Sequence, residues 1–160
     1  MKKLILSILA LGVILTVTHA ETKYEVGAGV NSAVLGVTAN WEVSKKTEVF
    51  AGIGLGAVVG GRYNIDDKVR MNISYGTQGY GFIEKQYTSF SNESTIDIEH
   101  LHGANIGLDY DFGDKDGWQA GLAYMLTSNI DDVKEKYKKM GAEEVIGSSK
   151  GVRLTLAYRY

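Results

Sequence analysis

The sequence contains no cysteine and no proline. Without cysteine, the chain has no disulfide framework, no thiolate metal site and no thiol nucleophile. The absence of proline suits a chain made mostly of paired strands, because proline cannot donate a backbone hydrogen bond to a neighbouring strand. The formal net charge is only -2, so a nucleic-acid partner is not expected.

Long apolar runs are also scarce. The first run, residues 4–17, follows Lys2 and Lys3 and precedes Ala20, which is the pattern of a cleaved export signal over residues 1–20. It is shorter than the roughly 20 residues of a membrane-spanning helix, which weighs against the alternative of an uncleaved anchor. No later stretch is long and apolar enough for such a helix. We therefore expect residues 21–160 to enter a membrane, if they do, as β-strands.

What the chain has instead is alternation with a period of two, most clearly in residues 149–160. One face of this segment is apolar or aromatic and consists of Val152, Leu154, Leu156, Tyr158 and Tyr160. The other face carries two arginines and small residues. In a water-soluble protein the apolar face would cover a core. After an export signal, the same pattern is typical of a barrel strand with lipid outside and a polar lumen inside.

The alternation divides residues 21–160 into eight strands. We expect strands at residues 23–30 and 33–43, one beginning at 47, one ending at 65, and further strands at 69–83, 95–112, 118–127 and 149–160. Glycine-rich residues 56–61 also allow one long strand, but we place a turn there because bacterial single-chain barrels have even strand numbers. The predicted fold class is all-β, an eight-stranded antiparallel up-and-down transmembrane barrel.

The predicted connections differ in length between the two ends of the barrel. The turns near residues 44, 66 and 113 are short, whereas residues 84–94 and 128–148 form longer loops, which is the usual difference between periplasmic and outer ends. The last outer loop contains a short helix signal, with Asn129 as its cap. We expect its apolar stripe to pack against the barrel rim. That stripe is Ile130, Val133, Tyr137 and Met140.

Aromatic residues on the outward faces gather near the periplasmic end, where amphipathic rings prefer the membrane interface. The predicted girdle is Tyr24, Trp41, Tyr63, Phe112, Trp118, Tyr158 and Tyr160. Inward positions carry charges of both signs, and an eight-stranded barrel is just wide enough for side chains to fill it. We expect a charge network that closes the lumen, made of Glu25, Glu42, Glu48, Arg62, Arg70, Asp109, Asp111, Arg153 and Arg159. Tyr80 is also expected to face inward.

Two segments resemble a known family. Residues 50–56 read F-A-G-I-G-L-G, and residues 61–76 contain G-R-Y-N-I-D-D-K-V-R-M-N and then Y-G. These runs resemble the small OmpA-like and Opa-like outer-membrane β-barrels, which include structural proteins, adhesins and small pores. The closing run L-T-L-A-Y-R-Y resembles the C-terminal assembly signal of that family, although the signal usually ends in Phe and this chain ends in Tyr160. The resemblance implies the bacterial outer membrane, contact with its lipid and lipopolysaccharide, and the barrel-assembly machinery as a partner.

Three functions fit this sequence. The first is a non-enzymatic, adhesin-like barrel without cofactor or metal, acting through surface loops that carry Tyr87 and Phe90 toward an unidentified ligand. The second is a small pore. The third is a lipid-modifying enzyme using His100 and His102, but alternation puts Asp97 and Glu99 on the opposite face, where they cannot orient either histidine, and Ser94 has no acid partner. We favour the first.

Overall fold

The structure, a computed structural model, describes residues 22–86, 94–113, 117–142, 144–146 and 151–160. The predicted export signal lies outside this part of the chain. The strands are β1 (Thr22–Gly29), β2 (Val34–Ser44), β3 (Thr47–Gly54), β4 (Ala57–Asn64), β5 (Val69–Gln86), β6 (Ser94–Asp111), β7 (Gly117–Met125), β8 (Glu144–Ile146) and β9 (Val152–Arg159). A 3-10 helix, η1 (Val30–Ser32), and an α-helix, α2 (Ile130–Lys139), complete the elements. No described helix is long and apolar enough to cross a membrane.

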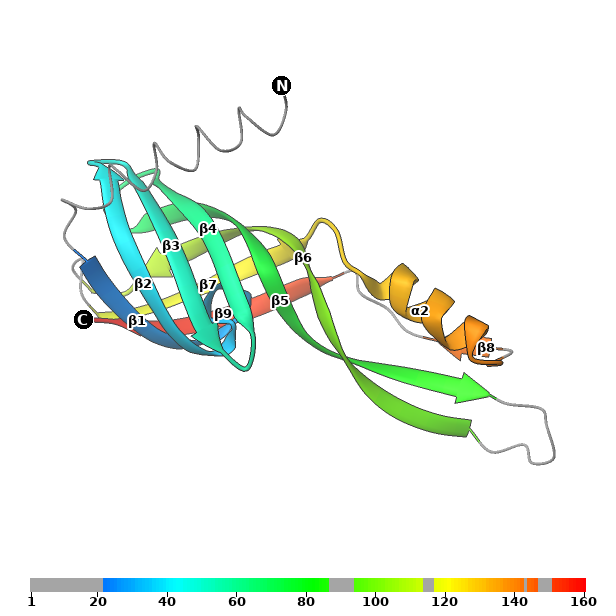
Figure 1. Cartoon of the computed structure of the whole chain (residues 1–160). Coiled ribbons are helices and arrows are strands. Elements are labelled where there is room, and N and C mark those ends of the chain that lie inside the picture. The colour runs from blue at the N-terminus through cyan, green and yellow to red at the C-terminus, as the bar shows by residue number, and fades with distance from the viewer. Residues whose placement is uncertain (1–21, 87–93, 114–116, 143, 147–150) are drawn as a thin grey trace, which may run out of the picture.

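All strands except β8 form a closed antiparallel barrel (Figure 1). Neighbours along the chain pair with one another, β9 pairs with both β7 and β1, and β4 pairs with β5. The predicted eight-stranded barrel is therefore confirmed, including the turn between β3 and β4, which lies at Leu55 and Gly56. We call the end that carries the β2–β3, β4–β5 and β6–β7 turns the turn end.

The two sides of the barrel wall are inverted relative to a water-soluble protein. Large apolar side chains are exposed on the outside of every barrel strand, among them Val26, Leu35, Ile53, Val59, Ile73, Leu108, Leu122 and Leu154. The buried polar and charged side chains come from the inward positions of the same strands, such as Glu25, Asn40, Asn72 and Asn105. Strand alternation produces both faces at once, because successive side chains point to opposite sides.

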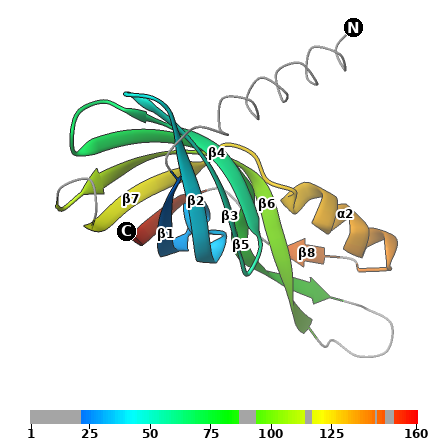
Figure 2. The same ribbon diagram turned by 60° about the vertical axis from the view of Figure 1, so that its left-hand side comes forward.

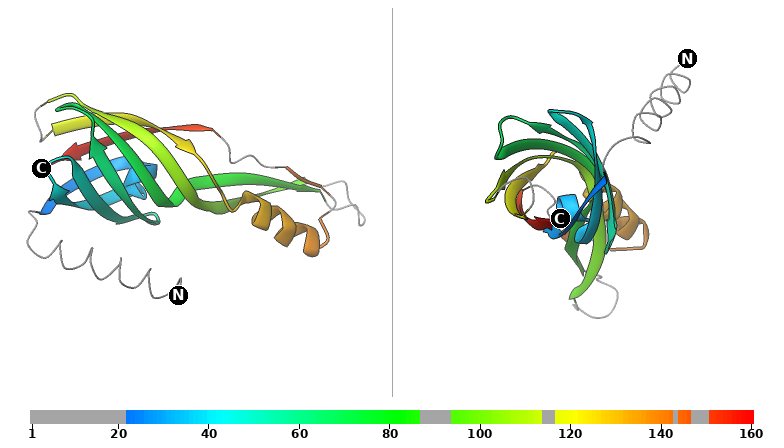
Figure 3. Two further views of the ribbon diagram at one scale, coloured as in Figure 1. Left: turned by 90° about the horizontal axis from the view of Figure 1, so that it is seen from above. Right: turned by 90° about the vertical axis from the view of Figure 1, so that its left-hand side faces the viewer.

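The connection between β1 and β2 folds into the lumen as η1, which lies inside the ring of strands when the barrel is viewed from the turn end (Figure 3, right). The strands predicted at residues 23–30 and 33–43 leave only Asn31 and Ser32 for a tight turn, and their alternation puts Val30 and Ala33 on the outward face. That prediction is wrong, because both residues are almost fully buried. Ala33 packs against Phe50 and Val58.

Hydrogen bonds hold η1 in place. The Thr38 hydroxyl donates to the backbone carbonyl of Asn31 at 3.1 Å, and the Ser74 hydroxyl donates to the Asn31 side-chain oxygen at 3.3 Å. The chain leaves the lumen through Ala33 and Val34, whose φ angles of 51° and 75° lie in the left-handed region. A β-branched residue such as Val34 rarely adopts that conformation, so the surrounding contacts must stabilise it.

β5 and β6 continue past the barrel as a long hairpin. β4 pairs with β5 only as far as Gly76, and β7 pairs with β6 only from Asn105 onward. A bulge at the start of this extension, next to Gly79 with its φ of 121°, shifts the side-chain alternation. Tyr80 was predicted to face inward, and this is wrong because the bulge turns it outward, where it is 38% exposed.

We call the extension of β5 and β6, with α2 and β8, the arm (Figure 2). α2 crosses one face of the hairpin, and β8 pairs with the outer edge of β5. Ile130, Val133 and Tyr137 of α2 form a buried cluster with Ile83 and Leu101 of the hairpin. The predicted helix is present, but it packs on the arm rather than on the barrel rim, and Met140 is 63% exposed.

Polar contacts also fasten α2 to the hairpin. The Tyr137 hydroxyl bonds to the carboxylates of Asp97 and Glu99, and Lys136 donates to Glu99 at 2.9 Å. These hydrogen bonds to Tyr137 and Lys136 hold the pKa of Glu99 below its ordinary value. Burial and the same carboxylates raise the pKa of Tyr137. The prediction that the Asn129 side chain caps α2 is wrong. This side chain bonds to the backbone of β6 instead.

Leu101 should be essential for the arm and dispensable for the barrel. It is 1% exposed in the cluster under α2, so Leu101→Ala should destabilise the packing of α2 by about 2–5 kcal/mol. Ile98 lies on the opposite face of β6 and is 61% exposed, so Ile98→Ala is the matched control with a small effect. Hydrogen exchange should speed up in α2 and β8 of Leu101→Ala only. Equal exchange in both variants would contradict this packing.

Candidate functional site in the barrel lumen

The centre of the lumen is occupied by two interlocked arginine–glutamate pairs. Arg62 on β4 donates to both carboxylate oxygens of Glu25 on β1, each at 2.8 Å. Arg159 on β9 donates to both oxygens of Glu48 on β3, at 3.1 and 2.7 Å, and its Nε donates to Glu25 at 2.7 Å. Two-pronged bonds of this kind fix both partners more firmly than single neutral hydrogen bonds.

A second set of contacts surrounds these pairs. Arg70 on β5 bonds to Asp111 on β6 and to Gln119 on β7. Asp109 accepts hydrogen bonds from Asn72 at 2.8 Å and from Thr155 at 3.2 Å. The network thereby links strands on all sides of the lumen, and its side chains are almost completely shielded from solvent.

One arginine of the network also stacks on an aromatic ring in the lumen. The Arg62 guanidinium lies 4.5 Å from the centre of the Phe50 ring. Phe50 fits because it faces Gly60 on β4, where a Cβ atom would lie only 2.5 Å from the Phe50 ring. The lumen is therefore filled in two layers. The charge network lies toward the turn end, and η1 with Phe50 lies on the side of the network that is nearer the arm.

The structure brings together most of the residues that were predicted for the lumen. Seven of them meet in the network described above: Glu25, Glu48, Arg62, Arg70, Asp109, Asp111 and Arg159. Glu42 and Arg153 do not join it. Glu42 is exposed, because it lies beyond the network at the turn end. Arg153 is half-buried and lies past η1, and within the described part of the chain it makes no ion pair.

Sequence reasoning missed the neutral members of the network, Asn40, Asn72, Gln119 and Thr155. All four lie at inward positions of their strands, so the alternation that selected the charged residues would have selected them too. Their amide and hydroxyl groups supply hydrogen bonds that the carboxylates and arginines do not satisfy among themselves.

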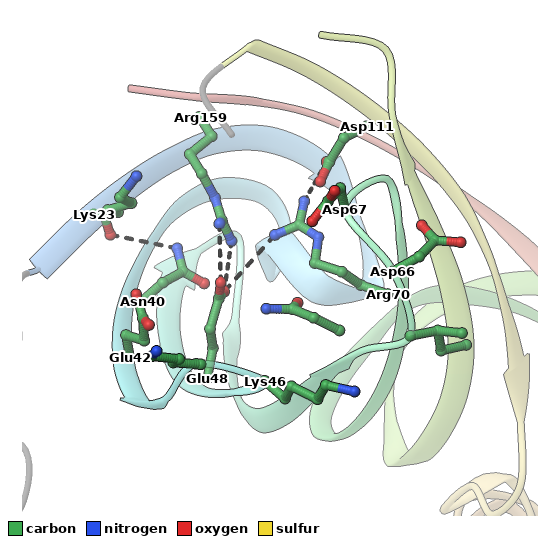
Figure 4. A pocket seen from close by; sticks show the side chains of 13 residues that line it. Lys23, Asn40, Glu42, Lys46, Glu48, Asp66, Asp67, Arg70, Asp111 and Arg159 are labelled. Atoms are coloured by element: carbon green, nitrogen blue, oxygen red, sulfur yellow. Dashed lines mark hydrogen bonds and ion pairs between the residues drawn. The ribbon is translucent and has the colours of Figure 1, made fainter. Parts of the chain in front are cut away.

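A cavity of about 220 Å³ opens at the turn end of the lumen (Figure 4). Glu48, Arg70 and Arg159 line its inner end, and Lys23, Glu42 and Asp67 are among the residues nearer the opening. The cavity is therefore a shallow mouth that ends at the charge network. Asp66, on its rim, accepts hydrogen bonds from the backbone N–H groups of Lys68 and Val69, which lowers the pKa of its carboxyl group.

The predicted girdle residues lie on the outer surface near the turn end. Six of the seven are between 42% and 63% exposed, and Trp41 is half-buried. Tyr24 stacks on Tyr160 with 6.5 Å between ring centres, and Trp118 meets Tyr158 edge-on at 5.4 Å. The first of these contacts spans the junction where β1 and β9 close the barrel.

Of the remaining candidates, Tyr87 and Phe90 fall outside the described residues, whereas His100 and His102 lie toward the arm. His100 and His102 are exposed and contact the rings of Tyr80 and Tyr75. Asp97 and Glu99 lie on the face of β6 opposite these histidines, as predicted, and there they bond to side chains of α2. Among the described side chains, no group of three His, Asp or Glu residues could hold a metal ion.

Comparisons with protein-family models, curated proteins and solved structures found no match. The resemblance to OmpA-like and Opa-like barrels therefore stays a prediction from the sequence motifs.

Removing one arginine from the network should be costly. Arg62→Met leaves Glu25, which is 0% exposed, with one of its three charge-assisted hydrogen bonds, and should destabilise the barrel by about 3–5 kcal/mol. Arg153→Met, on an inward position outside the network, should cost about 1 kcal/mol or less. Urea titration of the barrel in lipid vesicles measures both free energies. Equal costs would show that the lumen charges are hydrated rather than paired.

Proposed function

We propose that this chain is a non-enzymatic integral outer-membrane barrel whose lumen is closed by its own side chains, and that it acts through the membrane and through its arm. The observation that carries the proposal is that exposed apolar side chains cover the outside of every barrel strand. We call the surface that these side chains form together the belt. A water-soluble protein would have to expose this surface to water, and exposed apolar patches of that extent mark contact with a membrane or another protein.

The dimensions of the belt fit a membrane. Ten positions separate His102 on β6 from Phe112, the residue that follows β6, which is about 33 Å at ~3.3 Å per residue. For a strand tilt of ~40°, this is about 25 Å along the barrel axis, the height of the apolar band of outer-membrane barrels. Aromatic residues flank the belt at the turn end, and Tyr75, Tyr124 and His102 flank it at the arm end.

The sequence motifs support the same environment. The resemblance to OmpA-like and Opa-like barrels favours the bacterial outer membrane, with lipid and lipopolysaccharide around the belt. Tyr160 and the alternate residues before it would serve as the signal for the barrel-assembly machinery. In this orientation the turn end faces the periplasm and the arm projects from the outer surface, as the longer connections predict.

A small pore is the second candidate, since a barrel encloses a lumen. The charge network and η1 favour the closed barrel over the pore, because both layers fill the cross-section with bonded side chains. A lipid-modifying enzyme is favoured less. The carboxylates nearest to His100 and His102 on β6 lie on the opposite face and bond to Tyr137 and Lys136.

Membrane insertion should be sensitive to charge on the belt. Leu122 lies at mid-height on β7 and is 54% exposed on the outside, so Leu122→Arg should cost about 2–4 kcal/mol, as at a bilayer midplane. Ala123→Ser, on the adjacent inward position, is the control. Outer-membrane fractions should contain a band that migrates differently before and after boiling. This folded band should weaken with Leu122→Arg only, and its absence from the unmodified protein would contradict the proposal.

A separate prediction about the conductance of the barrel follows from the closed lumen. In a planar lipid bilayer, the purified barrel should show little or no steady conductance, because the bonded side chains of the charge network and η1 fill the lumen. Deleting the Arg62 pairing in Arg62→Met should produce brief, small openings. A large and stable conductance in the unmodified protein would refute the closed lumen and favour the pore.

A further inference from the structure

The connection from β1 to β2 combines a strained backbone with a position inside the lumen. Ala33 and Val34 have φ angles of 51° and 75°, in the left-handed region, which is unfavourable for residues with a Cβ atom. The cost is greatest for Val34, because its side chain is β-branched. The strain is therefore concentrated at the point where the chain leaves η1 and enters β2.

The polar contacts of η1 inside the lumen are incomplete. Asn31 accepts hydrogen bonds from Thr38 at 3.1 Å and from Ser74 at 3.3 Å. Its amide nitrogen is buried and has no hydrogen-bond partner among the described residues, and a buried donor without a partner is costly. The burial of Val30 and Ala33, each at most 1% exposed, acts in the other direction. Apolar packing therefore holds η1 in the lumen against strain and an unsatisfied amide.

The pairing of β1 with β2 offers these residues a second position without that strain. Its register places Gly29 opposite Val34. One more pair in the same register, between Val30 and Ala33, would leave only residues 31–32 for the turn. Two-residue turns are the commonest connections in antiparallel hairpins, and asparagine tolerates the left-handed backbone that they require. Both positions therefore share one register, and the chain exchanges between them without a shift of the paired strands.

We propose that η1 is a movable plug, which leaves the lumen when residues 30–33 extend the β1–β2 hairpin by this pair. In the extended position Val34 has an ordinary strand backbone, and the turn lies in solvent. The space that η1 vacates lies beside Phe50 and Ser74, on the arm side of the charge network. The inference rests on the closed lumen of the proposed function. It divides the closure into two barriers in series, so solutes pass only when η1 and the charge network are displaced together.

The absence of cysteine from the chain makes the movement measurable, because Ser32→Cys introduces its only thiol. Ser32 is 3% exposed within η1, so a charged, water-soluble maleimide reaches this thiol only after η1 leaves the lumen. The exposed turn position Lys45→Cys gives the rate for a freely accessible thiol. In the folded barrel in detergent micelles, mass spectrometry should show that Ser32→Cys is labelled to completion, about 10- to 1,000-fold more slowly than Lys45→Cys, as for a minor state.

Two further substitutions in the Ser32→Cys protein should shift the rate in opposite directions. Val34→Gly removes strain that exists only when η1 is inside, and should slow labelling roughly tenfold. Val37→Gly is the matched control within about threefold, because this residue of β2 keeps an ordinary paired backbone in both positions. Thr38→Val removes the hydrogen bond to the Asn31 carbonyl and should speed labelling about fivefold.

The outcomes separate the plug from the closed lumen on which it rests. Labelling of Ser32→Cys as fast as that of Lys45→Cys would show an open lumen and contradict the proposed function. No labelling, or equal rates with Val34→Gly and Val37→Gly, would overturn the movable plug and leave the closed lumen intact. In a planar bilayer, adding Val34→Gly to Arg62→Met should make the brief openings rarer, because both barriers must be displaced. An unchanged frequency of openings would also overturn this inference.

Discussion

The pairing of β1 with β9 is the constraint on which the rest of the structure depends. It closes the sheet, removes the free edges of the barrel wall and limits the lumen to the width of packed side chains. In the same register, Glu25 lies opposite Arg159. Closure of the backbone therefore also brings together the first ion pair of the lumen, and Glu25 extends it to Arg62 on the far side of β2 and β3.

Within that narrow space, charge and shape have to be satisfied together. The network contains four carboxylates, Glu25, Glu48, Asp109 and Asp111, and three arginines, Arg62, Arg70 and Arg159, so neutral Asn and Thr donors complete the bonding of Asp109. The unusual backbone at Ala33 and Val34 fits the same logic, because it lets η1 enter the lumen and fill the part that the charges do not reach. The outside of the wall thus presents exposed apolar side chains, whereas the lumen is stabilised by paired polar groups.

Much of this architecture follows from alternation alone. The period of two predicts every barrel strand, most of the outward apolar set and most of the lumen charges, since each barrel strand has one outward and one inward side. It fails where a local contact changes the alternation or the path. The bulge beside Gly79 turns Tyr80 outward, bonds from Thr38 and Ser74 draw Asn31 into the lumen, and Asn129 serves β6 rather than α2. Arg153 is at an inward position, as alternation predicts, but it lies too far from the turn end to reach the charge network. Alternation shows which side a residue faces and does not show how far along the barrel axis it lies. β8 is too short for its pattern to be detected.

The central claim is that lipid surrounds the belt and that the aromatic girdle lies at its interface. The chain has two tryptophans, Trp41 and Trp118, and both belong to the girdle near the turn end. Their fluorescence in vesicles made with lipids brominated at different depths tests the claim most directly. We predict strong quenching when the bromines lie near the headgroups and weaker quenching when they lie near the bilayer centre. Emission unaffected by brominated lipid at any depth would contradict the account.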